Sequence, residues 1–128
     1  MQASIKKLNL DDEFYTAEQC FIIEQSNTDE DPGVSIARAR VEPGVTTRWH
    51  RLVGTTERYL ILQGKGWVEI ENLSPQEVTT GDIVTIPPMC RQRIANIGSE
   101  DLIFLAICTP RFSDAIYQDI EDNPNGLA

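Results

Sequence analysis

The chain has 128 residues, enough for one domain with its own hydrophobic core. It is 41% hydrophobic and 24% charged, and no apolar run is long enough to cross a bilayer, so we expect a soluble protein rather than a membrane protein. The net charge of −9 argues against a nucleic-acid partner, because binding phosphates requires a basic surface.

The charge is unevenly distributed. Residues 1–37 hold eight acids and two lysines, and residues 94–128 hold six acids and one arginine. Residues 38–93 hold seven arginines and one lysine against six acids. These arginines are either solvated or paired on strand surfaces, or some of them line a pocket for an anionic ligand, since a guanidinium holds carboxylate or phosphate well.

The cysteines and the first residues indicate the compartment. Cys20, Cys90 and Cys108 are odd in number and form no CxxC, which predicts reduced thiols in a cytoplasm. The two lysines near the start are not followed by an apolar segment, so no secretory signal is expected.

Along the chain, short segments rich in β-branched and aromatic residues alternate with turn signals. In residues 34–41 the alternation is strict and places Arg38 and Arg40 on one face. Residues 53–56 are predicted to close a hairpin, residues 74–81 to form a turn, and residues 114–120 to form a short helix capped by Ser113. We predict strands over residues 18–26, 34–41, 46–52, 57–64, 66–73, 82–88, 91–98 and 100–109. So many strands without interleaved helices predict an all-β sandwich or barrel.

Two segments have regular spacing around residues that carry chemistry. In the first, Gly44 is followed by five residues and His50, then four residues separate Leu52 from Glu57, and six more lead to Gly64. His50 is the only histidine in the chain.

The second segment begins sixteen residues after the first. Gly81 is followed by five residues and Pro87, and Met89, Gln92 and Asn96 complete it.

Together these segments resemble the paired motifs of the cupin family, with Leu52 and Gln92 in place of two histidines and Met89 in place of a glycine. The resemblance implies one domain over residues 1–128: N-terminal strands 18–41, a first motif 44–64, a second motif 81–96, and a last strand and tail 100–128. It also implies a double-stranded β-helix, or jelly-roll barrel, that is usually a homodimer with its site inside.

In metal-binding cupins, the residues at positions 50, 52, 57 and 92 hold the ion. Here only His50 and Glu57 keep the usual ligand types, Gln92 offers a carbonyl oxygen, and Leu52 offers no donor. A His50–Glu57–Gln92 site would hold one divalent ion (Mn, Fe, Ni or Zn) weakly. The alternative hypothesis is a metal-free pocket in which His50 and Glu57 form a hydrogen bond with each other.

Alternation along the strands predicts an inward row of Arg48, His50 and Leu52 facing Glu57 and Tyr59. A histidine beside a carboxylate is suited to acid–base chemistry, and Tyr59 is a candidate phenolic proton donor. Arg48, Arg38 and Gln92 are candidate ligand-binding residues.

These residues suggest an isomerase, epimerase or lyase acting on a small, anionic metabolite, or a dioxygenase if metal binds. The alternatives are a ligand-binding or sensing cupin without turnover, and a structural barrel without small-molecule activity. Family resemblance alone does not transfer activity.

Overall fold

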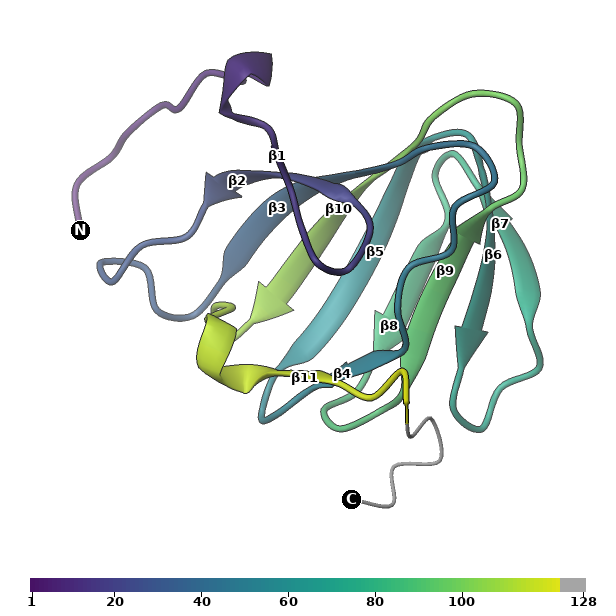
Figure 1. Ribbon diagram of the computed structural model, residues 1–128. Coiled ribbons are helices and arrows are strands. Elements are labelled where there is room, and N and C mark those ends of the chain that lie inside the picture. Colours follow the sequence, from purple (N-terminus) through teal and green to yellow (C-terminus); the bar gives the residue numbers. More distant parts are fainter. Residues whose placement is uncertain (123–128) are drawn as a thin grey trace.

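The structure is a computed structural model that describes residues 1–122. Two antiparallel β-sheets face each other as a jelly-roll barrel (Figure 1). One sheet has the order β1-β2-β3-β10-β5-β8, comprising β1 (Phe14–Tyr15), β2 (Phe21–Ser26), β3 (Ser35–Val41), β10 (Leu102–Thr109), β5 (Thr56–Gln63) and β8 (Ile83–Ile86). The other has the order β11-β4-β9-β6-β7, comprising β11 (Tyr117–Asp119), β4 (His50–Leu52), β9 (Gln92–Asn96), β6 (Lys65–Ile70) and β7 (Gln76–Thr79). The predicted all-β barrel is confirmed.

Helical structure in residues 1–122 is limited to two 3-10 turns, η1 (Leu10–Asp12) and η2 (Asp114–Ile116). None of the helices in this described part of the chain is long and apolar enough to span a membrane.

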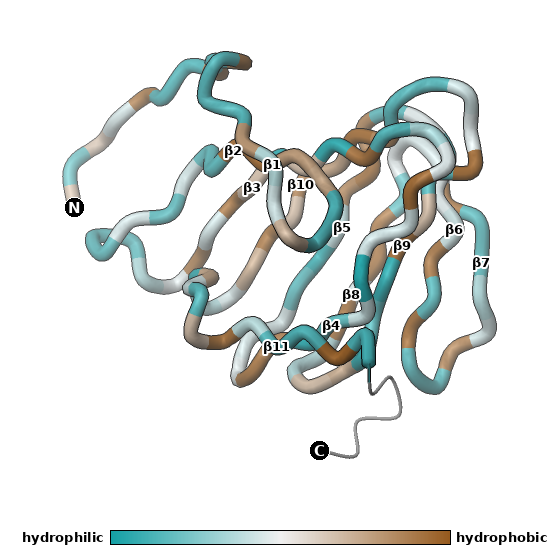
Figure 2. Tube along the Cα trace, in the orientation of Figure 1, coloured by the Kyte–Doolittle hydropathy of each residue, from teal (hydrophilic) through white to brown (hydrophobic). Residues whose placement is uncertain are grey.

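The composition of the inward faces divides the barrel into a filled end and a hollow end. Figure 2 shows hydrophobic and hydrophilic residues alternating along several strands, as expected when one face of a sheet is buried. At one end aliphatic side chains at most 1% exposed fill the interior, namely Val41, Ile61, Ile94 and Leu102. Toward the other end the same strands carry small or polar residues.

The strand register explains the hollow end. Leu102 pairs with Val41, but six residues later on the same strand Cys108 pairs with Ser35 on one side and Glu57 on the other. Three small or polar side chains replace the aliphatic ones there, so the interior is not filled and a cavity remains.

A tight connection joins β5 to β6 and carries the chain from one sheet to the other. Gly64 has φ of +90°, and a Cβ at this position would lie 2.9 Å from the carbonyl oxygen of Asp101. Glycine is therefore the residue that fits both the backbone conformation and the close approach.

Three local predictions are corrected. Residues 53–56 do not close a hairpin, because β4 pairs with β9 and β11 in one sheet while β5 pairs with β10 and β8 in the other. Part of the predicted turn 74–81 is a strand, β7, paired with β6. Of the predicted helix 114–120, only Asp114–Ile116 is helical, and the chain then continues as β11 along the edge of β4. Local sequence patterns do not specify which strand edge a segment will pair with. Here the C-terminal segment pairs with the free edge of β4 and forms β11.

Candidate active site

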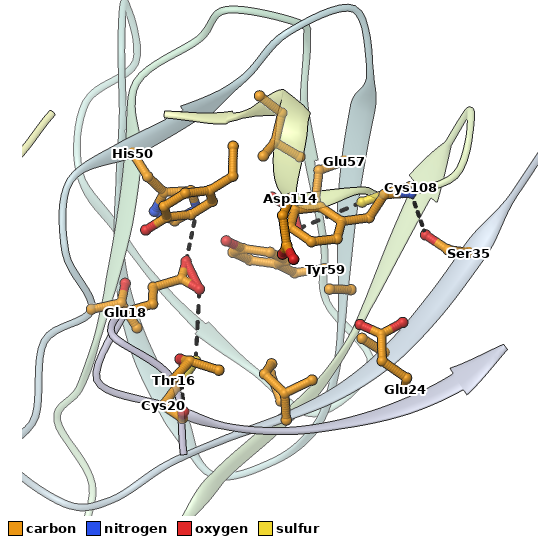
Figure 3. A pocket seen from close by; sticks show the side chains of 18 of the residues that line it. Thr16, Glu18, Cys20, Glu24, Ser35, His50, Glu57, Tyr59, Cys108 and Asp114 are labelled. Atoms are coloured by element: carbon orange, nitrogen blue, oxygen red, sulfur yellow. Dashed lines mark hydrogen bonds and ion pairs between the residues drawn. The ribbon is translucent and has the colours of Figure 1, made fainter. Parts of the chain in front are cut away.

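A cavity of about 300 Å³ occupies the hollow end of the barrel. Inward residues of β2, β3, β4, β5 and β10 form its wall, and the segments before β2 and after β10 complete its rim. His50, Glu57 and Tyr59, three of the predicted site residues, lie on this wall (Figure 3). The cavity is large enough for a small metabolite.

His50 is buried, with 2% of its surface exposed, and both its ring nitrogens have protein partners. Nδ1 donates to the backbone carbonyl of Arg48 at 2.8 Å. Nε2 lies 3.0 Å from a carboxylate oxygen of Glu18. Because both acceptors are oxygens without a proton to give, both ring nitrogens act as donors, which is the bonding pattern of a protonated imidazolium.

Glu18 is the site residue that the sequence analysis missed. It lies 32 residues before His50, in the connection between β1 and β2, where Gln19 has φ of +71°. A backbone hydrogen bond of 3.3 Å from Arg48 N–H to the Glu18 carbonyl fixes this connection against the segment before β4. Figure 3 shows the Glu18 side chain between His50 and Thr16. The sequence carries no signal for this contact, since only the tertiary fold brings the two segments together.

The ion pair determines the protonation of both partners. Burial alone would lower the pKa of His50, but the charge and hydrogen bond of Glu18, together with the charge of Glu57, raise it to about 9. Burial would raise the pKa of Glu18, but the His50 charge holds it below its ordinary value. At neutral pH the wall of the cavity therefore holds an imidazolium beside a carboxylate.

Glu57, Gln92 and Tyr59 form a second, buried hydrogen-bond network. The Gln92 amide donates to Glu57 Oε1 at 2.9 Å and its carbonyl oxygen accepts from the Tyr59 hydroxyl at 2.5 Å. These bonds fix which way the Gln92 amide points, because an ionised Glu57 carboxylate only accepts and must face the NH2 group, which leaves the amide oxygen to accept from the Tyr59 hydroxyl. Gln92, predicted to be a ligand-binding residue, thus orients Glu57, and Tyr59 orients Gln92. The predicted hydrogen bond between His50 and Glu57 is replaced by separate partners, Glu18 and Gln92.

Burial raises the pKa of Glu57 to about 7, although the nearby His50 charge opposes this shift. A carboxylate that gains and loses its proton near neutral pH is well suited to general acid–base catalysis. Burial and the Glu57 charge raise the pKa of Tyr59 well above its ordinary value, so its hydroxyl keeps its proton. Burial and a nearby carboxylate charge also raise the pKa of two thiols, with Glu57 near Cys108 and Glu18 near Cys20. Neither thiol is therefore a thiolate nucleophile.

The C-terminal segment closes the cavity over His50. The Tyr117 ring stacks on the imidazole with 5.3 Å between ring centroids and 21° between ring planes. β11 pairs antiparallel with β4, so that Asp119 lies opposite His50. The sequence pattern predicts a helix at Tyr117, but its contact with His50 depends on strand β11, which forms instead.

The arginines lie outside the cavity. Arg48, predicted to face inward, pairs with Asp119 at 2.7 Å and is 29% exposed. The alternation from His50 does not extend to Arg48, because β4 begins only at His50. Arg38 lies on the outer face of β3 and contacts Glu13 at 3.3 Å.

The cavity residues do not fit a divalent metal. Leu52 contributes no donor, both His50 nitrogens are hydrogen-bonded, and the Gln92 oxygen accepts from Tyr59. Within residues 1–122 no group of three His, Cys, Asp or Glu side chains is arranged to hold a metal ion. Protein metal sites use three or four good donors, and the predicted set of His50, Glu57 and Gln92 does not offer them as arranged.

Similar proteins place this barrel in a family. A protein of Methanocaldococcus jannaschii described as uncharacterised is 37% identical over 79 residues, and the match covers 62% of this chain and 62% of that protein. The structure of KdgF from Halomonas sp. matches with a TM-score of 0.71 at 16% identity, covering 82% of this chain and 93% of that one. Pac13, a nucleoside dehydratase also solved from Streptomyces with uridine, matches with a TM-score of 0.74 at 16% identity over 92% of both chains. At these identities the two solved structures establish the fold alone. The Cupin domain family matches residues 37–108, which is more than half of the chain, and the chain therefore belongs to the cupin family.

Proposed function

We propose that this cupin is a proton-transfer enzyme of the isomerase or lyase class that acts on a small metabolite inside the barrel. The observation that carries the proposal is the pairing, on one cavity wall, of a buried carboxylate with a pKa of about 7 and an imidazolium held by its own counter-ion. Two titratable groups whose environments separate their pKa values are the usual arrangement of a base and an acid.

In this mechanism Glu57 removes a proton from a carbon next to a carbonyl group of the substrate. The Gln92 amide holds Glu57 Oε1, so Oε2, which has only the weak Cys108 thiol donor at 3.8 Å, is the oxygen that takes the proton. The positive charge of His50, maintained by Glu18, stabilises the negative charge that develops as the C–H bond breaks. Returning the proton from Glu57 to a different carbon gives isomerisation, and passing it to a neighbouring hydroxyl, which then leaves as water, gives elimination. The structural neighbour Pac13 is a nucleoside dehydratase, so elimination of water is included among the reactions to be tested.

The test is exchange of carbon-bound protons in deuterated water, followed by NMR on a library of small carbonyl compounds. We expect Glu57→Gln to reduce exchange at least about 100-fold, as loss of a general base does. Glu77→Gln removes the same charge from an exposed position on β7 and serves as the matched control. Exchange that persists unchanged in the folded Glu57→Gln variant would overturn the proposal.

The rate is also expected to depend on pH in a bell shape. It should rise as Glu57 loses its proton near pH 7 and fall as His50 loses its proton near pH 9, since the base must be ionised and the imidazolium charged.

One observation favours a second function, ligand binding or sensing without turnover. Both nitrogens of His50 are occupied by protein atoms, as in a pocket that only shapes a binding site. A compound that raises the melting temperature without any proton exchange would support this second function.

We also propose that the chain forms a homodimer through the outer face of the six-stranded sheet. Leu60 pairs with both Leu105 and Ile83 on that face, and Leu62 and Ile83 are 43% and 65% exposed. We expect light scattering to give a dimer and Ile83→Lys to raise its dissociation constant at least about tenfold, since a buried charge costs more than a tenfold change in affinity.

The matched control for this interface is Ile97→Lys, which changes an exposed apolar residue following β9. A wild-type monomer, or an Ile83→Lys dimer as tight as the control, would contradict the interface.

The cytoplasmic location also stays a proposal. It is supported by Cys20, Cys90 and Cys108, which are all free thiols rather than disulfides.

A further inference from the structure

The charges that line the cavity are the reverse of those expected for an anionic ligand. Four carboxylate side chains, Glu18, Glu24, Glu57 and Asp114, line it together with His50. No arginine or lysine of residues 1–122 lies on the lining. The cationic group on the lining, His50, is already paired with Glu18, so an anion in this cavity would lose its hydration and meet an excess of like charges, which is costly in a poorly solvated site.

Glu24 has a carboxylate oxygen that is buried and unsatisfied. Its Oε2 has no hydrogen-bond partner among the described residues, although it is shielded from solvent. Lys6 lies near this residue, but its ammonium donates to the Glu24 backbone carbonyl at 2.6 Å rather than to the carboxylate. Glu24 itself lines the cavity, and buried carboxylate oxygens are normally paired, so a turn of this side chain toward a donor on the ligand would supply the partner that Oε2 lacks.

Glu24 and the ion pair of Glu18 and His50 lie on different sides of the cavity. Figure 3 shows the Glu24 carboxylate across the cavity from His50 and Glu18. Glu18 is satisfied by His50, whereas the Glu24 carboxylate forms no ion pair with any residue of 1–122. A ligand that spans the cavity would thus place one end at the reacting groups and the other at Glu24.

The remaining wall is rich in aromatic side chains. Five of the lining residues are aromatic, namely Phe14, Tyr59, Phe104, Phe112 and Tyr117. Aromatic faces attract organic cations, and this attraction is stronger where water is excluded. Carboxylates combined with aromatic walls are the chemistry that recognises an ammonium group.

We infer that the cavity selects a ligand with a positively charged amino group, which Glu24 binds on the side opposite the ion pair of Glu18 and His50. This inference deepens the proposed function, because it rests on the cavity being the substrate site and names the charge of the substrate. It replaces the anionic ligand predicted from the sequence, whose arginines turn out to lie outside the cavity.

Three compounds of similar size and different charge test the inference. Tyramine carries an ammonium, tyrosol a hydroxyl and 4-hydroxyphenylacetate a carboxylate on the same phenol ring. Calorimetry with the full chain should show tyramine binding at least about tenfold more tightly than tyrosol, as one charged hydrogen bond provides, and no binding of the carboxylate. Glu24→Gln should remove most of the preference for tyramine and leave tyrosol binding unchanged.

Glu30→Gln is the matched control, because it removes the same charge from an exposed residue and should keep the preference. The inference is overturned if tyramine fails to bind at millimolar concentration, if the carboxylate binds as well as the amine, or if Glu24→Gln behaves like the control. These outcomes are independent of the proton-exchange test, which measures chemistry at Glu57. Loss of amine preference with intact exchange rejects the ligand charge alone, and loss of exchange with intact preference rejects the proposed reaction alone.

Discussion

Replacing Glu18 by glutamine should bring the pKa of His50 down from about 9 toward, or below, its ordinary value of 6.5. Glu18 is the main cause that raises the His50 pKa against burial, and the amide keeps the shape of the side chain without its charge. Because His50 is the only histidine, a single imidazole signal followed by NMR against pH measures this change directly. Glu24→Gln is the control within the same cavity, since Glu24 does not touch His50.

The same substitution should change the pH dependence of stability. A histidine whose pKa is raised in the folded state stabilises the fold fully below its unfolded pKa, near 6.5, and this contribution is lost as the pH rises through about 9. The raised pKa of Glu57, about 7, acts in the same direction, because the folded state favours the protonated carboxyl. Its contribution to stability is therefore lost as the pH rises from about 4.5 to about 7. Glu18 has the opposite effect on stability at low pH. Its pKa is lowered in the folded state, so the stability that its ionised form contributes is lost as the pH falls through the lowered pKa.

Wild-type protein should therefore be most stable in mildly acidic solution and lose stability toward pH 9. The His50 contribution alone is on the order of 3–4 kcal/mol, since its pKa rises from 6.5 to about 9 and each pKa unit corresponds to about 1.4 kcal/mol. In urea titrations, Glu18→Gln should be destabilised at pH 6 and approach the wild type at pH 10, where His50 is neutral in both. An equal loss of stability at both pH values would contradict the ion pair and indicate a purely structural role for Glu18.

Restoring histidine at two positions is expected to create a metal site. In the double variant Leu52→His, Gln92→His, four inward side chains at positions 50, 52, 57 and 92 would match the usual ligands of a metal-binding cupin. The affinity for Ni²⁺ or Co²⁺ should rise more than about 100-fold over the wild type, because even indirect partners of a metal site change affinity by 10- to 100-fold. Calorimetry and the visible absorption of the Co²⁺ complex measure this gain.

Glu18 competes for the same imidazole, which gives the experiment its control. His50 Nε2 lies 3.0 Å from Glu18, and a metal bound to that nitrogen must displace the carboxylate. Adding Glu18→Gln to the double variant should therefore strengthen metal binding further, and adding Glu77→Gln on exposed β7 should not. A folded double variant, checked by circular dichroism, that binds Co²⁺ no better than the wild type would show that the strand positions do not converge as described.

Much of the fold was determined by local patterns in the sequence. Alternation in residues 57–64 placed Glu57 and Tyr59 on an inward face, and the structure buries these side chains. In residues 34–41 alternation separated two faces without deciding which is inward, and Arg38, predicted to bind a ligand, lies on the outer one. The spacing of the two motifs was sufficient to identify the barrel, because glycines at turns and a proline at a strand end fix where each strand starts and stops. The same motif spacing predicted that Gln92 and His50 belong to one site, and the two residues pair across β4 and β9.

Tertiary structure alone decided how these side chains are used. Glu18 reaches His50 from a connection 32 residues earlier, and no periodicity encodes such a contact. Tyr117 covers His50 because an open strand edge was available, so that a segment with a weak helical pattern became β11. Alternation applies only where the backbone is extended, which is why Arg48, just before β4, was wrongly placed inside.

The sequence by itself thus determined the family, the barrel and the inward positions of His50 and Glu57, because strand periodicity and turn residues act over a few neighbours. The tertiary structure decided the protonation of His50, the unfilled cavity and its negative lining, because burial and charge depend on residues that are distant in the sequence and meet only in the folded chain.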